Sequence, residues 1–599
     1  MYGCVAGFLW LVAAIFSPEY FAHNSNNRNR FRLFNMLTLI ATLGVFFSAD
    51  LFTAFLFFEI MSFTSYAMVA HDESPGAMRA GETYLTIAIF SGMAILMGMM
   101  LLWRRAGTLD FNKLYEICAA LTDKSPFYFP GALMIIGFGA KAGMFPLHVW
   151  LPQAHSAAPA PASALLSGIL TKTGVFGVAL VSSCIFPGDQ VWGAALLIPA
   201  AVTMLLGAVL GLLSNNLKRT LACSSVSQIG FIIVGIALQC LLGDHNALAV
   251  RGTLLHMMNH SLIKLVLFIS AGVVSIDRHD LKLDKIRGFG RGKPLFLFVF
   301  LMGTLGICGV PFWNGYISKT LLHESIVDSI RLYSGLSLEF PLRLLEWAFI
   351  ITGGLTIAYM LKVFFVLFAK NGAEPGTRGT RYMSRRTSVA LGISAALIPL
   401  SGCITVISNT LADWGQGFFH GHAPDHSVSY FSWENLQGAL ISALIGAAVY
   451  IVVVRGLLMR RGQNGAKTYP DLRTKRLNLE DIVYRPLLRG FIKILVAFAH
   501  VAALLPDALV KLFLRAIAHF REPSPDALVK LVLRTVLRAR RKPYMPRKFL
   551  SQHIWVSQRQ PQQTGEESSI IGDFSLGLLF VGAGICVVII YVFIQSLSA

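Results

Sequence analysis

Two lysines lie inside long apolar runs of this sequence, where a lysine is costly. Lys141 lies in the run 131–145 and Lys172 in the run 163–176, whose other residues are almost all apolar or small. A charge at the centre of a bilayer costs roughly 2.5–3.5 kcal/mol even on insertion-based scales. Burial favours the neutral amine and a nearby carboxylate favours the charged one, so such a lysine can take up and release a proton. We therefore predict that both belong to a proton pathway; the alternative is that they snorkel to the headgroup layer.

Two further charges have the same character. Glu59 lies in an apolar segment with no charged neighbour within one helical turn, so it needs a partner on another helix or a proton. Lys319 follows the stretch 309–315, which contains glycine and proline, and a lysine just past a helix break can face an internal aqueous cavity. His323 and Glu324 lie one turn further on. For Glu59 and Lys319 a position near the end of a helix is the alternative.

A third feature is the spacing of His256, His260 and Lys264, which are four residues apart and therefore lie near one face of a helix. Bases repeated along one face suit a proton relay. Two histidines at this spacing can also bind zinc, but no third ligand or glutamate base stands between them. A histidine pair satisfied within the core is the other alternative. Other ionisable residues near span ends are interpreted as solvated or loop-anchoring, namely His148, His155, Lys218, Arg219, Asp277, His279 and Asp280.

The elements that carry these residues must be membrane helices. Of the 599 residues, 55% are hydrophobic and only 14% are charged, against about 25% in soluble proteins. The apolar runs are about 20 residues long and do not alternate, which indicates an all-α polytopic protein and not a barrel. No cleavable signal peptide is evident, and the eight cysteines form no CxxC pair, so we expect no metal site.

The distribution of basic residues predicts the topology. One side of the predicted membrane carries most of the lysines and arginines, including the loop 278–293 and all of 459–570. The positive-inside rule makes this side cytoplasmic and places both termini outside. The net charge of +20 follows this topology, so we expect no nucleic-acid partner. The fourteen predicted spans are 3–20, 33–49, 51–70, 80–103, 129–150, 160–187, 192–213, 220–241, 248–275, 295–330, 345–369, 388–409, 432–458 and 571–597.

The chain divides into a transmembrane domain, 1–458, a cytoplasmic-side lateral helix with a linker, 459–570, and a final transmembrane helix, 571–597. The spans 160–187 and 295–330 contain internal glycines, and the second also contains a proline. We predict that both are broken helices, a common feature of ion pathways.

Residues 478–545 have the pattern of a basic amphipathic helix that lies along the membrane. A near-repeat occurs at 506–515 and 525–534, and each copy begins with Pro-Asp, a good helix start. We expect breaks near Pro506 and Pro523. About 65 helical residues would reach roughly 100 Å, far enough to cross a neighbouring subunit. The alternative is a surface helix that packs only on its own bundle.

Four motifs carry a family resemblance. They are FFEIMS at 57–62, KAGMFPLHVWLPQAH at 141–155, APASALLSGILTKTG at 160–174 and the stretch 256–264, and they occur in this order. The sequence resembles the antiporter-like, proton-pumping subunits. This superfamily includes the large membrane subunits of respiratory complex I, the large subunits of Mrp antiporters and the membrane subunits of group 4 NiFe hydrogenases. The segments 103–111, 278–281 and 478–485 resemble the hydrogenase and Mrp branch most.

The resemblance implies a core of two inverted five-helix repeats and a lateral helix that ends in one more span. The implied proton path runs through the paired Glu59 and Lys141, the linking Lys172, the central His256, His260 and Lys264, and the terminal Lys319. Two departures stand out. The two spans that usually precede the segment aligned with Met1 are not found, and the linking position is a lysine where some members have a histidine.

On this resemblance we expect a proton-translocating subunit of a multi-subunit energy-converting complex, in the first place a membrane-bound hydrogenase type. Its partners would be other membrane subunits that the lateral helix contacts, soluble redox subunits, the lipid bilayer and protons, with Na⁺ left open. We expect no cofactor, so any oxidoreductase activity would belong to the partner subunits. The expected location is a bacterial or archaeal cytoplasmic membrane. The alternatives are an Mrp-type cation/proton antiporter subunit and the membrane subunit of an energy-coupled inorganic-carbon uptake system.

Overall fold

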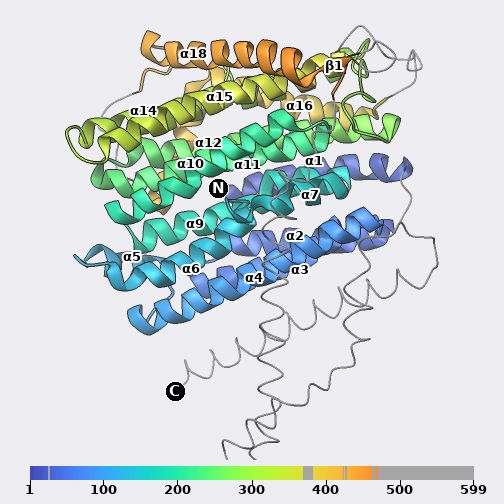
Figure 1. Ribbon diagram of the computed structural model, residues 1–599. Helices are drawn as coiled ribbons and strands as arrows, with labels where there is room; N and C mark the ends of the chain where they lie inside the picture. Colours follow the sequence, from blue (N-terminus) through green and yellow to red (C-terminus); the bar gives the residue numbers. More distant parts are fainter. Residues whose placement is uncertain (24–26, 369–381, 422–423, 425–427, 462–466, 470–599) are drawn as a thin grey trace, which may run out of the picture. The chain divides into compact units, whose positions relative to one another are not determined.

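The computed structural model describes residues 1–23, 27–368, 382–421, 424, 428–461 and 467–469 (Figure 1). These residues all belong to one unit of the chain. The expected lateral helix, the linker after it and the final span lie outside the described residues, so they remain predictions.

The described residues are almost entirely helical, and the long helices lie side by side (Figure 1). A short antiparallel pair, β1 (Arg460–Arg461) and β2 (Lys467–Thr468), follows the last of them. The α-helices are α1 (Tyr2–His23), α2 (Arg28–Phe47), α3 (Leu51–Val69), α4 (Pro75–Ala106), α5 (Phe111–Ala119), α6 (Ser125–Ala142), α7 (Trp150–Ala157), α8 (Ala160–Leu165), α9 (Thr171–Ile185), α10 (Gln190–Leu213), α11 (Leu217–Leu242), α12 (Ala247–Arg278), α13 (Pro294–Cys308), α14 (Asn314–Leu332), α15 (Glu339–Phe368), α16 (Arg385–Cys403), α17 (Thr405–Gln416) and α18 (Trp433–Val449). Short 3₁₀ segments are η1 (Leu147–Val149), η3 (Gly243–His245) and η4 (Gly417–Phe419), and π-helical segments are η2 (Leu166–Leu170) and η5 (Tyr450–Leu458).

Twelve helical stretches of the described part are long and apolar enough to cross a membrane. They coincide with twelve of the fourteen predicted spans. The predicted span 295–330 is divided between α13, which is short, and α14, and the predicted span 571–597 is not described. The class of a helical polytopic membrane protein is therefore confirmed, while the count of fourteen remains a prediction.

The break predicted from glycine and proline lies between α13 and α14. Gly309 ends α13 in the left-handed conformation, with φ +73°, and its N–H donates to the carbonyl of Gly306. This conformation favours glycine because a Cβ atom would be strained there. Pro311 follows and has no backbone N–H with which to continue the helix. Gly315 then packs against the Gly306 carbonyl, which a Cβ atom at this position would approach to 1.9 Å.

The second predicted break, within 160–187, is not a gap: Ala160–Ile185 is one helical stretch that contains the π-helical segment η2. Lys172 is the second residue of α9, which follows η2. Single π-helical turns often occur at functional sites. A further interruption was not predicted: α6 ends one residue after Lys141, and Gly143, with φ +87°, turns the chain towards η1 and α7. Lys141, Lys172 and Lys319 therefore each lie within two turns of a place where a regular helix stops.

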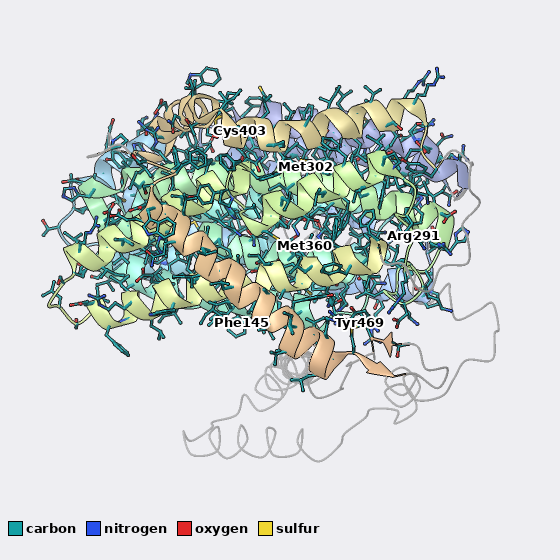
Figure 2. The ribbon with its side chains drawn as sticks, turned by 90° about the horizontal axis from the view of Figure 1, so that it is seen from above. Phe145, Arg291, Met302, Met360, Cys403 and Tyr469 are labelled. Carbon is teal, nitrogen blue, oxygen red and sulfur yellow. The ribbon has the colours of Figure 1, made fainter. Side chains whose placement is uncertain are left out.

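The helices differ greatly in how much of their surface is covered. The apolar stretches of α11 and of α8 to α9 are fully buried, whereas that of α18 and η5 is 11% buried. In Figure 1, α3, α4 and α6 lie near one end of the row of helices, α9, α11 and α12 lie inside it, and α14, α15 and α18 lie near the other end. Figure 2 shows α18 crossing the outside of the bundle. Large apolar side chains are exposed on the outer helices, which suits a lipid-facing surface.

Candidate functional site

Lys141 lies in a pocket of hydroxyl groups between α3, α4 and α6. Its Nζ donates to Ser62 Oγ at 3.0 Å and to Tyr84 OH at 2.6 Å. Tyr84 OH also shares a hydrogen bond of 2.5 Å with Ser65 Oγ. The amine lies 4.7 Å from the ring centre of Tyr84 and 5.8 Å from that of Phe58. A buried ammonium group is thus held by two hydroxyls and two aromatic rings, which stabilise positive charge.

Glu59 lies one turn before Ser62 on α3 and is only 7% exposed. Its carboxylate interacts electrostatically with Lys141, but neither oxygen has a hydrogen-bond partner among the described residues. The carboxylate faces Gly92 of α4, where a Cβ atom would come within 2.4 Å of Oε1. The two residues therefore lie near each other on different helices, but a direct ion pair between them is absent from the described contacts. A pair joined through water remains a prediction.

Lys172 is fully buried and touches His260 directly. Its Nζ lies 2.6 Å from His260 Nδ1 and also donates to the carbonyl of Ser167 at 2.6 Å. Ser167 lies in the π-helical segment η2, so the irregular turn places its carbonyl within reach of the lysine. Lys264 is an electrostatic neighbour of Lys172. The structure thus brings together the lysine of α9 and the histidine of α12, which are 88 residues apart in the sequence.

His256 lies one turn before His260 on α12, with their ring centres 6.4 Å apart. Its Nδ1 lies 2.9 Å from Ser318 Oγ, and its Nε2 lies 3.0 Å from Gln228 Oε1. The two rings are too far apart for a direct hydrogen bond. The contact with Ser318 connects α12 to α14, near the break between α13 and α14.

Lys264 and Lys319 are each bound to a backbone carbonyl. Lys264 Nζ donates to Leu221 O at 2.7 Å, and Lys319 Nζ donates to Ile307 O at 2.9 Å. Lys319 also lines a cavity of about 60 Å³, and its Nζ lies 5.2 Å from the ring centre of Phe231. A cavity therefore lies beside Lys319 past the helix break, and its being aqueous remains a prediction.

We call Lys172, His256, His260, Lys264 and Lys319 the central row, and Glu59, Ser62, Tyr84 and Lys141 the glutamate–lysine cluster. Direct contacts link Lys172 to His260 but do not link the cluster to the row within the described residues. A weak hydrogen bond joins α3 and α9, from Thr173 Oγ1 to Met61 Sδ at 3.5 Å. One continuous axis therefore remains a prediction that needs water to complete it.

Of the residues that we interpreted as solvated or loop-anchoring, His148, His155 and Lys218 are buried and therefore not solvated. Lys218 is loop-anchoring, because its amine binds the turn between α7 and α8. His155 stacks on Phe268 at 4.9 Å, and its two ring nitrogens have no hydrogen-bond partner among the described residues. Lys218 Nζ donates to Ala158 O at 2.9 Å. The histidines are buried because the chain returns into the bundle after α6, where η1 packs on α6 and α7 packs on α4 and α11. One signal could have shown that the two histidines are buried: residues 142–171 contain no charged side chain.

The other four residues of this group are partly or fully exposed, namely Arg219, Asp277, His279 and Asp280.

Lys362 on α15 was missed. It is 1% exposed, and its Nζ donates to the carbonyls of Gly211, Leu212 and Ser214 at 3.2, 2.6 and 2.6 Å. These carbonyls belong to the C-terminal end of α10, where a cation is favourable. The same lone-charge signal that identified Lys141 was available in the predicted span 345–369. Among the described residues no group of three or more histidine, cysteine or acidic side chains could hold a metal ion.

Comparison with known proteins adds three findings. Residues 48–337 match the family described as NADH:quinone oxidoreductase/Mrp antiporter, transmembrane. The chain is 30% identical over 406 residues to "Hydrogenase-4 component B" of Escherichia coli K12, which covers 66% of this chain and 60% of the relative. It is 29% identical over 418 residues to "Formate hydrogenlyase subunit 3" of the same organism, which covers 68% and 65%. The chain thus spans less than two thirds of the length of these relatives.

A solved structure agrees in fold. It is described as the membrane-bound sulfane sulfur reductase, an archaeal respiratory membrane complex, and one of its chains superposes with a TM-score of 0.58 at 21% identity. The superposition covers 75% of this chain and 83% of the other. At this identity the likeness concerns the fold alone. Together, these comparisons confirm the resemblance predicted from the motifs.

Proposed function

Because residues 48–337 of this chain belong to the NADH:quinone oxidoreductase/Mrp antiporter family, we propose that the protein is a proton-translocating membrane subunit of a multi-subunit energy-converting complex related to complex I. The two relatives named for hydrogenase-4 and formate hydrogenlyase favour a membrane-bound hydrogenase type of complex. The observation that carries the proposal is the contact of 2.6 Å between the buried Lys172 and His260. An amine and an imidazole at this distance can share and exchange a proton.

The proposed path begins at the glutamate–lysine cluster. Lys141 takes up a proton while Ser62 and Tyr84 hold its amine and the Glu59 carboxylate balances the charge. The proton then passes to Lys172 and across the contact to His260. His256, Lys264 and Lys319 continue the row towards the break between α13 and α14. Since like charges repel strongly where the dielectric is low, a proton that arrives at one lysine favours release from the next.

Water would complete this path. Buried polar atoms normally have a partner, and an ordered water supplies it where the protein does not. Among the described residues, buried polar atoms without a partner include those of Glu59, His260, Ser227, Asn314 and the Nε2 of Gln228. Glu59 lies in the cluster, and His260 and Gln228 lie in or next to the row. We propose that water chains at these atoms carry the proton between the ionisable groups.

The proposal also gives the subunit its place in the complex. The redox chemistry belongs to soluble partner subunits, and neighbouring membrane subunits contact the lateral helix. The basic loops and the lateral helix face the cytoplasm, and both termini face outward. The distribution of lysine and arginine along the sequence supports this orientation, and the two relatives named for hydrogenase complexes support the partner subunits.

A cation/proton antiporter subunit of the Mrp type is the second candidate, because the description of the matching family names both kinds of protein. A requirement for Na⁺ in transport, without coupling to a redox substrate, would favour it.

The test is Lys172→Met in the assembled complex, with proton pumping measured in vesicles. Methionine keeps much of the stem and removes the charge, so we expect assembly to survive and pumping to fall at least about tenfold. Lys113→Met, at an exposed lysine of α5, is the matched control and should pump normally. Wild-type pumping by Lys172→Met in an intact complex would contradict the proposal.

A further inference from the structure

The cavity beside Lys319 contains a second ionisable residue. The cavity has a volume of about 60 Å³, which is enough for several waters at roughly 10–15 Å³ each. Its lining includes Cys308, Tyr316, Lys319, His323 and Phe349. His323 lies four residues after Lys319 on α14, so the two side chains lie near the same face of the helix.

His323 joins this cavity to an acidic residue of the next helix. Its Nε2 lies 3.4 Å from Glu346 Oε1 on α15, and its ring lies 5.8 Å from that of Phe349. The side chains of His323 and Glu346 are 23% and 27% exposed, whereas Lys319 is 9% exposed. The exposed fraction therefore increases from Lys319 to His323 and Glu346.

The pair also lies on the way to a charged end of the bundle. Beyond it, α14 ends and α15 begins, and Arg331 pairs with Asp328 while Arg343 pairs with Glu339. The two arginine side chains are 70% and 58% exposed. The basic-residue distribution predicts that this end faces outward.

We propose that His323 and Glu346 form the exchange pair through which protons leave the central row. This inference rests on the proposed function and adds an exit to it. Water in the cavity carries a proton from the Lys319 ammonium to one nitrogen of His323, which leaves Lys319 as the neutral amine. The imidazolium then releases a proton from its other nitrogen to Glu346 or to water, and the neutral imidazole is restored.

The chemistry of the pair also selects the ion. An imidazole accepts a proton at one nitrogen and gives one up at the other, but it cannot pass on a sodium ion in this way. The Glu346 carboxylate offers a negative charge beside the imidazolium, which stabilises the intermediate. An exit made of this pair therefore commits this part of the path to protons.

The test compares three variants in the assembled complex reconstituted in vesicles. His323→Gln keeps polarity and size but cannot carry a proton, and Glu346→Gln removes the carboxylate. Glu324→Gln is the matched control, because Glu324 neighbours His323 on α14 but is not among the residues that line the cavity. We expect pumping to fall at least tenfold in the first two variants and to stay within twofold in the control.

A second readout separates transport from structure, namely pumping as a function of pH on the outward side. A proton carrier in the exit makes the rate depend on the outward-side pH, and His323→Gln should change this dependence. The other ionisable groups facing His323 are Lys319, Cys308 and Tyr316 in the cavity and Glu346, with Arg343 behind it; they remain in that variant.

The outcomes distinguish this inference from the proposed function. If His323→Gln pumps normally with the wild-type pH profile while Lys172→Met does not pump, the exit pair is wrong and the function stands. If Lys172→Met pumps normally, the function itself fails and the exit fails with it. If the complex with His323→Gln does not assemble, the Glu346→Gln variant provides the test. Normal pumping by Glu346→Gln would overturn the exchange pair, and a tenfold loss would support it.

Discussion

The glutamate–lysine cluster and the central row differ in the groups that stabilise their buried lysines. In the cluster, Lys141 has a carboxylate, Glu59, as an electrostatic partner and two hydroxyls as hydrogen-bond acceptors. The row contains three lysines and two histidines. No carboxylate of the described residues is among the electrostatic partners of its lysines. Each of these amines donates to a backbone carbonyl instead.

This difference indicates that the cluster and the row have different roles in proton transfer. A buried ion without a counter-charge costs several kcal/mol, and neighbouring like charges add repulsion. The five bases of the row therefore cannot all be protonated together, and a proton that enters must displace another. The cluster, whose charge is balanced, can hold a proton, whereas the row is suited to passing it on.

The largest effect should come from giving the row the counter-charge that it lacks. In His260→Glu a carboxylate would stand beside the Lys172 amine, which now lies 2.6 Å from His260 Nδ1. The resulting ion pair would fix the proton on the lysine, so we expect pumping in vesicles to fall about 100-fold while the complex assembles. His279→Glu, at an exposed histidine, is the control. Normal pumping by His260→Glu would show that the row tolerates a balanced charge.

A smaller effect is expected from removing the counter-charge of the cluster. Glu59→Gln deprives Lys141 of its carboxylate partner, but Ser62 and Tyr84 still accept hydrogen bonds from the amine. We expect proton pumping to fall about tenfold in an intact complex. Glu116→Gln, at an exposed glutamate of α5, should leave it unchanged. A loss as large as that of His260→Glu would mean that the cluster is no more tolerant than the row.

The sequence was sufficient to find the lone charges. Glu59, Lys141, Lys172 and Lys319 were visible because a charge in an apolar run is costly and needs a reason. Glycine and proline likewise marked the break before α14 and the interruption before Lys172. These signals depend only on the local sequence, so they can be recognised without knowing how the helices pack.

The partners could not be predicted, because they come from other helices. Ser62 and Tyr84 are ordinary residues of α3 and α4, and only packing brings them to Lys141. The burial of His155 was missed because a neutral histidine costs little near a membrane and gives no strong signal. The π-helical form of the interruption at η2 was also beyond prediction, since glycine marks a weak point but neighbouring helices decide the hydrogen-bond pattern.

The last comparison concerns a buried lysine outside both regions, and here the smallest effect on transport is expected. The Lys362 amine donates to three carbonyls at the end of α10, which is the geometry of a helix cap. Lys362→Met would leave those carbonyls without their donor and lower the free energy of unfolding by about 2 kcal/mol. We therefore expect a lower thermal midpoint for the purified complex but unchanged pumping per assembled complex. Lys172→Met should show the opposite pattern, with normal thermal stability and little pumping. If Lys362→Met abolished pumping in an intact complex, three carbonyl acceptors at a helix end would not mark a lysine as structural, and the row would have a further member on α15.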